Sequence, residues 1–233
     1  MLKKIGQIIL YIIIFFFAST TFTVIALKWL PVRFTPLMTI RYFENISNNN
    51  YHTQKKWKSI DDISPNMIQA VIASEDNKYM NHNGFDWDAI NDAIEHNKRN
   101  KNKRGASTIT QQVAKNVFLT PSRSWVRKGL EAYFTVLIEF FWSKERIMEV
   151  YLNVIEMGKG IYGAEAAAKY YFKKSARQLT REEAALIAAS LPNPQERDPA
   201  NPTAYLRKRQ QQIIKIMRQL GNIDIRGKNK TKK

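Results

Sequence analysis

Residues 5–27 of this 233-residue chain are almost uninterruptedly apolar, and they leave little choice of structure. A run of that length crosses about 30 Å of hydrocarbon as a helix, and in a bilayer a single segment satisfies its backbone polar groups only as a helix. Lys3 and Lys4 precede the run, and no acidic residue occurs before Glu44. By the positive-inside rule, the run predicts a single-pass anchor with residues 1–4 in the cytoplasm and the rest of the chain outside.

A cleaved signal peptide is the alternative interpretation of the same run. The apolar core of a signal peptide usually spans about 7–15 residues, which is shorter than the run seen here. Residues 24–26, Val-Ile-Ala, would form an acceptable cleavage site. The length of the run favours the anchor. Residues 28–58 are then expected to be a juxtamembrane linker that leads to a domain at residues 59–220.

The chain is strongly basic, with 37 Lys and Arg against 20 Asp and Glu and a formal net charge of +17. Such a balance often indicates a nucleic-acid partner, but a chain anchored outside the membrane meets lipid headgroups and lipid diphosphates instead. We therefore expect the membrane and anionic lipids as partners, and no nucleic acid. Alternatively, much of the excess is solvated surface, as we expect for the basic tail at residues 221–233. The chain has no cysteine, which excludes disulfides and thiol chemistry.

Hydrophobic periodicity predicts a helical domain without strands. Residues 28–43 mix aromatic and basic side chains, which suits either a membrane interface or packing on the chain's own domain, and residues 45–58 are predicted to be a polar loop. Ser64 and Pro65 predict an N-cap and a first helical residue, and the helix they begin would end at or near Glu75. Further helices are expected at residues 86–96, 108–117, 124–142, 146–152, 164–172, 184–191 and 203–220, with a glycine-rich turn at 158–163. The predicted fold class is all-α.

Two polar blocks stand out within the predicted domain. Residues 73–86 read A-S-E-D-N-K-Y-M-N-H-N-G-F-D, and residues 104–116 read R-G-A-S-T-I-T-Q-Q-V-A-K-N. Glu75 follows an apolar helical face, where a carboxylate can serve as a general base on a sugar hydroxyl, and Gly84 is expected to allow a turn with positive φ. The hydroxyls, amides and single lysine of the second block suit sugar hydroxyls and phosphate oxygens. The alternatives are an ordinary Glu-Asp pair at a helix end and a solvent-facing polar helix.

A third block, residues 123–131 with the sequence R-S-W-V-R-K-G-L-E, opens the helix predicted at residues 124–142. On a helical wheel Glu131 lies at the flank of the apolar stripe, so we expect it to face a cleft without being buried. The alternative is an ion pair between Arg127 and Glu131 at i,i+4 spacing, which contributes roughly a few tenths of a kcal/mol. None of the blocks has the spacing of a zinc site.

Together the blocks resemble the glycosyltransferase domain of peptidoglycan polymerases, glycosyltransferase family 51, in its monofunctional biosynthetic form. The family pattern reads E-D-x-x-F-x-x-H-x-G-[FI]-D, then G-[GA]-S-T-I-T-Q-Q-[LV]-x-K-N and later R-K-x-x-E, and the similarity covers about residues 60–200. Tyr79 stands where the family usually has Phe. The resemblance implies a lysozyme-like, helical glycosyltransferase domain, in agreement with the all-α prediction.

The resemblance also implies roles for individual residues. Glu75 would deprotonate the 4-hydroxyl of the acceptor, and Glu131 would act at the donor's diphosphate, either directly or through a divalent cation. It leaves open whether Mg²⁺ or Mn²⁺ is required there. The residues that match substrate-binding positions are Ser107, Thr108, Gln111, Gln112, Lys115, Asn116, Arg123 and Lys128. For Asp76, His82 and Asp86 the residues themselves leave two roles open, a share in the catalysis or fixing the loop, and we expect them to support the site.

A chain of this kind would polymerise lipid II into glycan strands for the cell wall, with inversion at the anomeric carbon and release of polyprenyl diphosphate. Its expected partners are lipid II, the growing lipid-linked glycan, the membrane, and other proteins of cell-wall synthesis and division. The expected location is the inner membrane, with the catalytic domain in the periplasm. Larger relatives carry penicillin-binding motifs, of which S-x-x-K and K-[TS]-G do not occur here, so we expect no transpeptidase activity.

Two other functions remain compatible with the sequence. The first is a lysozyme-like lytic enzyme, which also uses a Glu in a helical domain but needs no cations for a diphosphate. The second is a non-enzymatic membrane anchor whose basic domain recruits an anionic partner.

Overall fold

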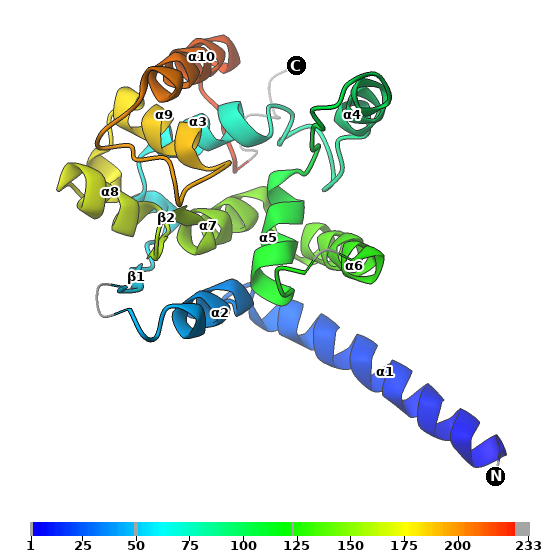
Figure 1. Cartoon of the computed structure of the whole chain (residues 1–233). Coiled ribbons are helices and arrows are strands. Elements are labelled where there is room, and N and C mark those ends of the chain that lie inside the picture. Colours follow the sequence, from blue (N-terminus) through cyan, green and yellow to red (C-terminus); the bar gives the residue numbers. More distant parts are fainter. Residues whose placement is uncertain (1, 49–50, 123, 227–233) are drawn as a thin grey trace.

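The computed structural model describes residues 2–48, 51–122 and 124–226, and helices dominate these ranges (Figure 1). The helices are α1 (Leu2–Ala26), α2 (Pro36–Glu44), α3 (Pro65–Glu75), α4 (Trp87–Arg99), α5 (Ile109–Phe118), α6 (Trp125–Phe141), α7 (Lys144–Val154), α8 (Ala164–Phe172), α9 (Arg181–Ser190) and α10 (Ala204–Leu220). Short 3-10 helices lie at Ile60–Asp62 and Ala176–Gln178. The all-α prediction is confirmed, and each helix predicted after residue 59 occurs within a few residues of its expected bounds.

The start and end of α3 follow the local signals in the sequence. Ser64 caps the helix by accepting a hydrogen bond from the backbone N–H of Asn66, and Pro65 is its first residue. The helix ends at Glu75, as predicted, because Asp76 leaves the helical region with a φ of −161°. The last residue of a well-capped helix therefore presents its carboxylate beside a loop.

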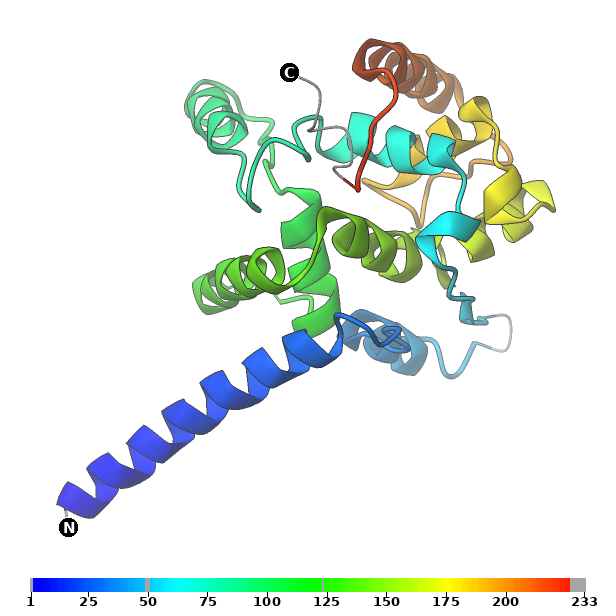
Figure 2. The ribbon, with the colours of Figure 1, turned by 180° about the vertical axis from the view of Figure 1, so that it is seen from behind.

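Two groups of helices share one core. α9 packs against α3 and α10, and α5 packs against α6 and α7, as Figure 1 and the opposite view in Figure 2 show. Small side chains allow the backbones of α8 and α9 to approach their neighbours, since both helices bury runs of alanine: Ala166, Ala167, Ala168, Ala184, Ala185, Ala188 and Ala189. The helix that carries the second polar block, α5, thus has a packed helix on either side and forms a rigid support.

A small sheet, which the sequence did not predict, joins the linker to the domain. The strands β1 (Gln54–Lys55), β2 (Glu156–Gly158) and β3 (Ile161–Tyr162) pair in the order β1-β3-β2, with β1 parallel and β2 antiparallel to β3. The expectation that the domain has no strand is therefore wrong. The expected loop at residues 45–58 contains β1, and the expected turn at residues 158–163 contains β3 and the end of β2. Strands of two or three residues are too short to show an alternating pattern.

α1 projects from the body of the molecule as a long helix (Figure 1, Figure 2). Its segment Lys3–Ala26 is long enough and apolar enough to cross a membrane. The C-terminal end of α1 is fastened to the domain, because Trp142 Nε1 donates to the carbonyl of Val24 at 2.8 Å and the hydroxyls of Thr20 and Tyr133 lie 2.8 Å apart. The domain therefore sits directly at one end of the helix.

α2 lies in the linker, where no helix was predicted. Thr35 caps it and Pro36 is its first residue. The helix packs against α5 and buries Met38, while Tyr42 and Phe43 remain exposed. Of the two interpretations of residues 28–43, packing on the domain therefore holds for one face of α2, and an exposed aromatic face remains.

Candidate active site

Glu75 is oriented by uncharged hydrogen-bond donors. Ser74 Oγ lies 3.0 Å from Oε1, and Gln112 Nε2 on α5 donates to Oε2 at 3.1 Å. The hydroxyl of the fully buried Tyr151 donates to Gln112 Oε1 at 3.3 Å, which fixes the orientation of the amide. Burial, and then the charges of Glu75 and Asp76, raise the pKa of Tyr151 well above its usual value, so this hydroxyl remains a donor. Both oxygens of the carboxylate thus meet neutral donors.

Asp76 joins the end of α3 to the start of α5. Its buried carboxylate accepts from the backbone N–H of Ile109 at 3.0 Å and lies 2.8 Å from His82 Nε2. His82 Nδ1 accepts from the N–H of Gly84 at 3.2 Å, so Nε2 carries the proton that faces Asp76. Gly84 has a φ of +88°, as predicted, and a Cβ there would lie 2.7 Å from Thr135 Cγ2. These contacts hold the loop that follows α3.

Thr108 caps α5 and shares its hydrogen bonds with Gln111. Thr108 Oγ1 accepts from the Gln111 N–H at 3.2 Å and donates to the carbonyl of Gly84 at 2.7 Å. Gln111 Oε1 accepts from the Thr108 N–H at 3.0 Å, which completes a capping box. Both side chains are buried, so the helix itself uses their polar atoms. Ser107, by contrast, is exposed and its hydroxyl is open to a ligand.

A pocket of about 300 Å³ opens beside Glu75. Asp86 borders it and caps α4 by accepting from the Ala89 N–H at 3.0 Å. The lining residues are Ser74, Glu75, Asp76, Asn77, Lys78, Asp86, Ala89, Asp92, Gly105, Ala106, Ser107 and Thr108. The structure therefore brings together five of the predicted site residues here, all from the two polar blocks. We call this the carboxylate pocket.

A second pocket, of about 250 Å³, lies toward the other end of α5. Its lining residues are Leu37, Lys115, Asn116, Leu119, Pro121, Ser122 and Arg127. It shares no residue with the carboxylate pocket, and Thr108 and Lys115 are about 10 Å apart along the axis of α5 at the usual helical rise. The predicted site is therefore divided between two ends of one helix. We call this second cavity the cation pocket.

Two cations of the cation pocket keep unused hydrogen-bonding capacity within the described residues. The Lys115 ammonium makes no hydrogen bond or ion pair there, and Arg127 Nε is buried without an acceptor. Desolvation lowers the pKa of Lys115; the Glu131 charge opposes this effect, and the charges of Arg127 and Lys128 add to it. A buried cationic donor without an acceptor suits an anion such as a phosphate. Arg123, also expected here, lies outside the described residues.

Glu131 is buried, which corrects the expectation that it would face a cleft. Its side chain is held by two cations: Arg127 Nη1 donates to Oε2 at 2.8 Å, and Lys128 Nζ pairs with Oε1. The carboxylate can be buried, at 3 % exposure, because these charges neutralise it. The alternative i,i+4 pair of Arg127 and Glu131 is thus confirmed. Glu131 lines neither pocket.

A divalent cation does not fit this carboxylate. Both oxygens of Glu131 already face cations, whereas a metal ion bound between one carboxylate and a diphosphate requires a free carboxylate oxygen. Across the described ranges, no three His, Asp or Glu side chains are grouped so that they could hold a metal ion. A Mg²⁺ or Mn²⁺ ion at the cation pocket would therefore take its ligands mainly from the diphosphate and from water, and not from a cluster of protein carboxylates.

Three residues near the site were not predicted to belong to it. Arg127 lines the cation pocket, although its spacing indicated only an ion pair. Tyr151 lies outside the three blocks, and only the fold brings its hydroxyl to Gln112. Glu139 accepts from Thr110 Oγ1 at 2.5 Å and from Lys144 Nζ at 2.7 Å, and so ties α6 to α5. The R-K-x-x-E segment carried a signal for Arg127, whereas the other two depend on long-range packing.

Known proteins similar to this chain point to one family. The transglycosylase family model matches residues 42–218. A biosynthetic peptidoglycan transglycosylase of Bacteroides thetaiotaomicron is 57 % identical over 217 residues, which cover 93 % of this chain and 88 % of the relative. Proteins of the same name from Bdellovibrio bacteriovorus and Shewanella oneidensis are 51 % and 55 % identical, and the matches cover 87 % and 75 % of this chain and 81 % and 75 % of those proteins. The chain belongs to the transglycosylase family.

Proposed function

We propose that this chain is a monofunctional biosynthetic transglycosylase that polymerises lipid II into glycan strands for the cell wall. Membership of the family and the names of its relatives support this function. One structural observation carries the proposal: different groups lie at the two ends of α5. The carboxylate of Glu75 is held in a fixed orientation near one end, and cations with free hydrogen-bond donors lie near the other. Glycosyl transfer from a lipid diphosphate needs a base and an anion site at two ends of one reacting centre.

In the proposed reaction, Glu75 takes the proton from the acceptor's hydroxyl as the oxygen attacks the anomeric carbon of the donor. A bond between oxygen and the anomeric carbon forms, and the bond from that carbon to the diphosphate breaks. The electron pair leaves with polyprenyl diphosphate, and attack opposite the leaving group inverts the anomeric centre. Lys115 and Arg127 neutralise the charge that develops on the leaving group.

Other residues of the polar blocks act through these groups. Gln112 orients the carboxylate of Glu75, since its amide is fixed between Tyr151 and that carboxylate. Glu131 holds Arg127 and Lys128 in place and does not itself touch the substrate. In the proposal, the remaining contacts to the sugars and the diphosphate come from exposed or pocket-lining side chains, namely Ser107 and Asn116.

The proposed location of the enzyme is supported by α1 and its flanking charges. We propose that α1 anchors the chain in the inner membrane, that Lys3 and Lys4 keep the N-terminus in the cytoplasm, and that the domain lies in the periplasm. The lipid-linked substrates and other proteins of cell-wall synthesis and division would meet it there. The contacts between α1 and the domain keep the domain next to the membrane that holds these substrates.

The proposal is tested with the full-length protein in detergent. The protein is incubated with lipid II that carries a fluorescent label, and in parallel with finished glycan strands. Lipid II should be converted into long strands that a gel resolves, and the finished strands should stay intact. Cleavage of the strands without growth would instead identify a lytic enzyme, and no change in either substrate would leave only an anchoring role.

A further inference from the structure

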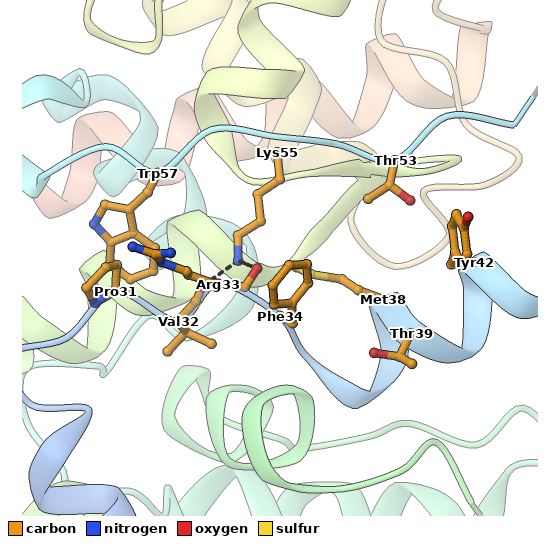
Figure 3. Close-up of a pocket in the computed structure, with 10 residues that line it drawn as sticks. All are labelled: Pro31, Val32, Arg33, Phe34, Met38, Thr39, Tyr42, Thr53, Lys55 and Trp57. Carbon is orange, nitrogen blue, oxygen red and sulfur yellow. Dashed lines mark hydrogen bonds between the residues drawn. The ribbon is translucent and has the colours of Figure 1, made fainter.

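A cavity of about 800 Å³ lies in the linker, outside both pockets of α5. Its walls come from residues 31–42 and 53–57, which are brought together by the packing of α2 and by the pairing of β1 with β3. Figure 3 shows Phe34, Met38 and Trp57 arranged around this space. The volume lies in the range of specific small-molecule sites, and most of the lining is apolar. An occupant must therefore present a substantial apolar part.

The polar side of the cavity is cationic. Lys55 Nζ donates to the carbonyls of Val32 and Arg33, as the dashed lines in Figure 3 mark, and its third proton remains for a ligand. The Arg33 guanidinium is exposed and makes no hydrogen bond or ion pair within the described residues. No Asp or Glu is among the residues that line the cavity. An anionic group is therefore favoured next to the apolar walls.

The cavity also lies where a membrane surface is expected. Pro31, on its rim, follows the end of α1 by only a few residues. Phe34 lines the cavity and is strongly exposed, as are Trp29, Leu30 and Phe43, which lie within two residues of lining residues along the chain. Exposed aromatic side chains gather at the boundary between hydrocarbon and headgroups. A molecule that reaches the cavity from the bilayer would arrive with its headgroup at the level of the two cations.

We propose that this cavity binds an anionic phospholipid, with acyl-chain carbons against Phe34, Met38 and Trp57 and the phosphate between Arg33 and Lys55. The charge, the apolar walls and the position beside α1 favour this occupant over an uncharged lipid or a peptide. The site is independent of the proposed reaction. The lipid cavity and the cation pocket share α2 as a wall, because Met38 lines the lipid cavity and the preceding Leu37 lines the cation pocket.

Native mass spectrometry of the full-length protein in neutral detergent tests this site. The protein is titrated with phosphatidylglycerol and, separately, with phosphatidylcholine of the same acyl chains. One phosphatidylglycerol should bind more tightly than any phosphatidylcholine. Arg33→Gln should weaken that binding about fivefold, as expected for loss of one cation near a lipid phosphate. Lys28→Gln is the matched control, because Lys28 is an exposed cation of the same linker that does not line the cavity, and it should leave the affinity unchanged.

A second variant tests the position of the lipid without removing charge. Thr39 is exposed and lines the cavity, so Thr39→Trp should occupy part of it and weaken the tight binding event while the protein stays folded. Equal binding of both lipids, or unchanged phosphatidylglycerol binding by Thr39→Trp, would overturn the proposal. So would displacement of phosphatidylglycerol by polyprenyl phosphate at equal concentration, since the cavity would then belong to a substrate lipid. Each of these results is separate from the outcome of the lipid II assay.

Discussion

Near the start of α5 a carboxylate is oriented by uncharged donors, whereas near its end cations surround a carboxylate that is itself buried. Ser74 and Gln112 hold Glu75, which lines a pocket. Arg127 and Lys128 hold Glu131, which lines none. The same residue type, seen in the same family pattern, therefore occupies two opposite environments.

The difference suits the role that each end has in the proposed reaction. A general base must keep its affinity for a proton, and an adjacent cation would reduce that affinity. An anion site needs positive charges that stay in place before the anion arrives, and a buried counter-charge provides this. Lys115, Arg127 and Lys128 together with Glu131 carry three positive charges and one negative charge, so a net charge of +2 remains at this end, which suits the proposed diphosphate.

The largest effect is expected from Glu75→Gln. The amide keeps the size of the side chain but cannot take a proton, so we expect kcat for polymerisation to fall by roughly 10³-fold, within the usual range for loss of a general base. Glu95→Gln is a matched control, because Glu95 is exposed and paired with Lys98 on α4. The gel assay with labelled lipid II measures both. Substantial activity in Glu75→Gln, with the thermal midpoint unchanged, would remove Glu75 from its proposed role.

Lys115→Gln addresses the other end of α5. A charge-assisted hydrogen bond to phosphate contributes about 2 kcal/mol, so kcat/KM should fall about 30-fold. The dependence of kcat/KM on salt concentration should also become weaker, because one screened attraction is lost. Glu75→Gln should leave the salt dependence as it is. An identical salt response in both variants would contradict the contrast between the neutral and the charged end.

Glu131→Gln distinguishes a positioning residue from a catalytic one. Arg127 and Lys128 would lose their buried counter-charge, and since both are partly exposed we expect a loss of about 2 kcal/mol of stability. Activity should fall about tenfold, mainly through KM for the donor, because the cations are no longer held. Glu131→Asp should recover part of both losses. A fall in kcat alone with unchanged stability would indicate direct participation in the chemistry.

Helix bounds and motif chemistry were predictable because both are local. Ser64 and Pro65 define the start of α3 from neighbouring residues alone, and the position of Glu75 follows from the length of that helix. The order of the two polar blocks likewise predicts a carboxylate and a lysine in one region. What the blocks could not show is that Gln112 faces Glu75, while Lys115, about one turn further along, lines a different pocket together with Arg127 of α6.

The burial of Glu131 was not predictable from its own helix. A helical wheel places it at the edge of the apolar stripe, but its exposure depends on the packing of α5 against α6 and on Lys128 turning back toward it. The same holds for the linker cavity, which forms only once β1 pairs with β3 across roughly a hundred residues of chain. Contacts between distant segments decide burial, and a single sequence carries little information on them.

The pH dependence of the reaction should also separate the two ends. Desolvation lowers the pKa of Lys115 below the usual 10.5, so the alkaline limb of kcat/KM should begin below that value and should vanish in Lys115→Arg, because arginine does not titrate there. The folded state then binds fewer protons than the unfolded chain between the lowered pKa and 10.5, and the free energy of unfolding should rise with pH in that window. An alkaline limb that persists in Lys115→Arg would assign it to another group.

The smallest effect on kcat is expected from replacing one of two fully buried tyrosines. Tyr79, where the family usually has Phe, donates to the Lys144 carbonyl at 2.7 Å, and Tyr151 donates to Gln112. Either change to Phe removes one buried hydrogen bond and should lower stability by about 1 kcal/mol. Only Tyr151→Phe should also lower kcat, about threefold, because Gln112 can then rotate away from Glu75, the proposed general base. Equal kcat values in the two variants would mean that the neutral end of α5 keeps its geometry, with Gln112 still facing Glu75, without the hydroxyl of Tyr151.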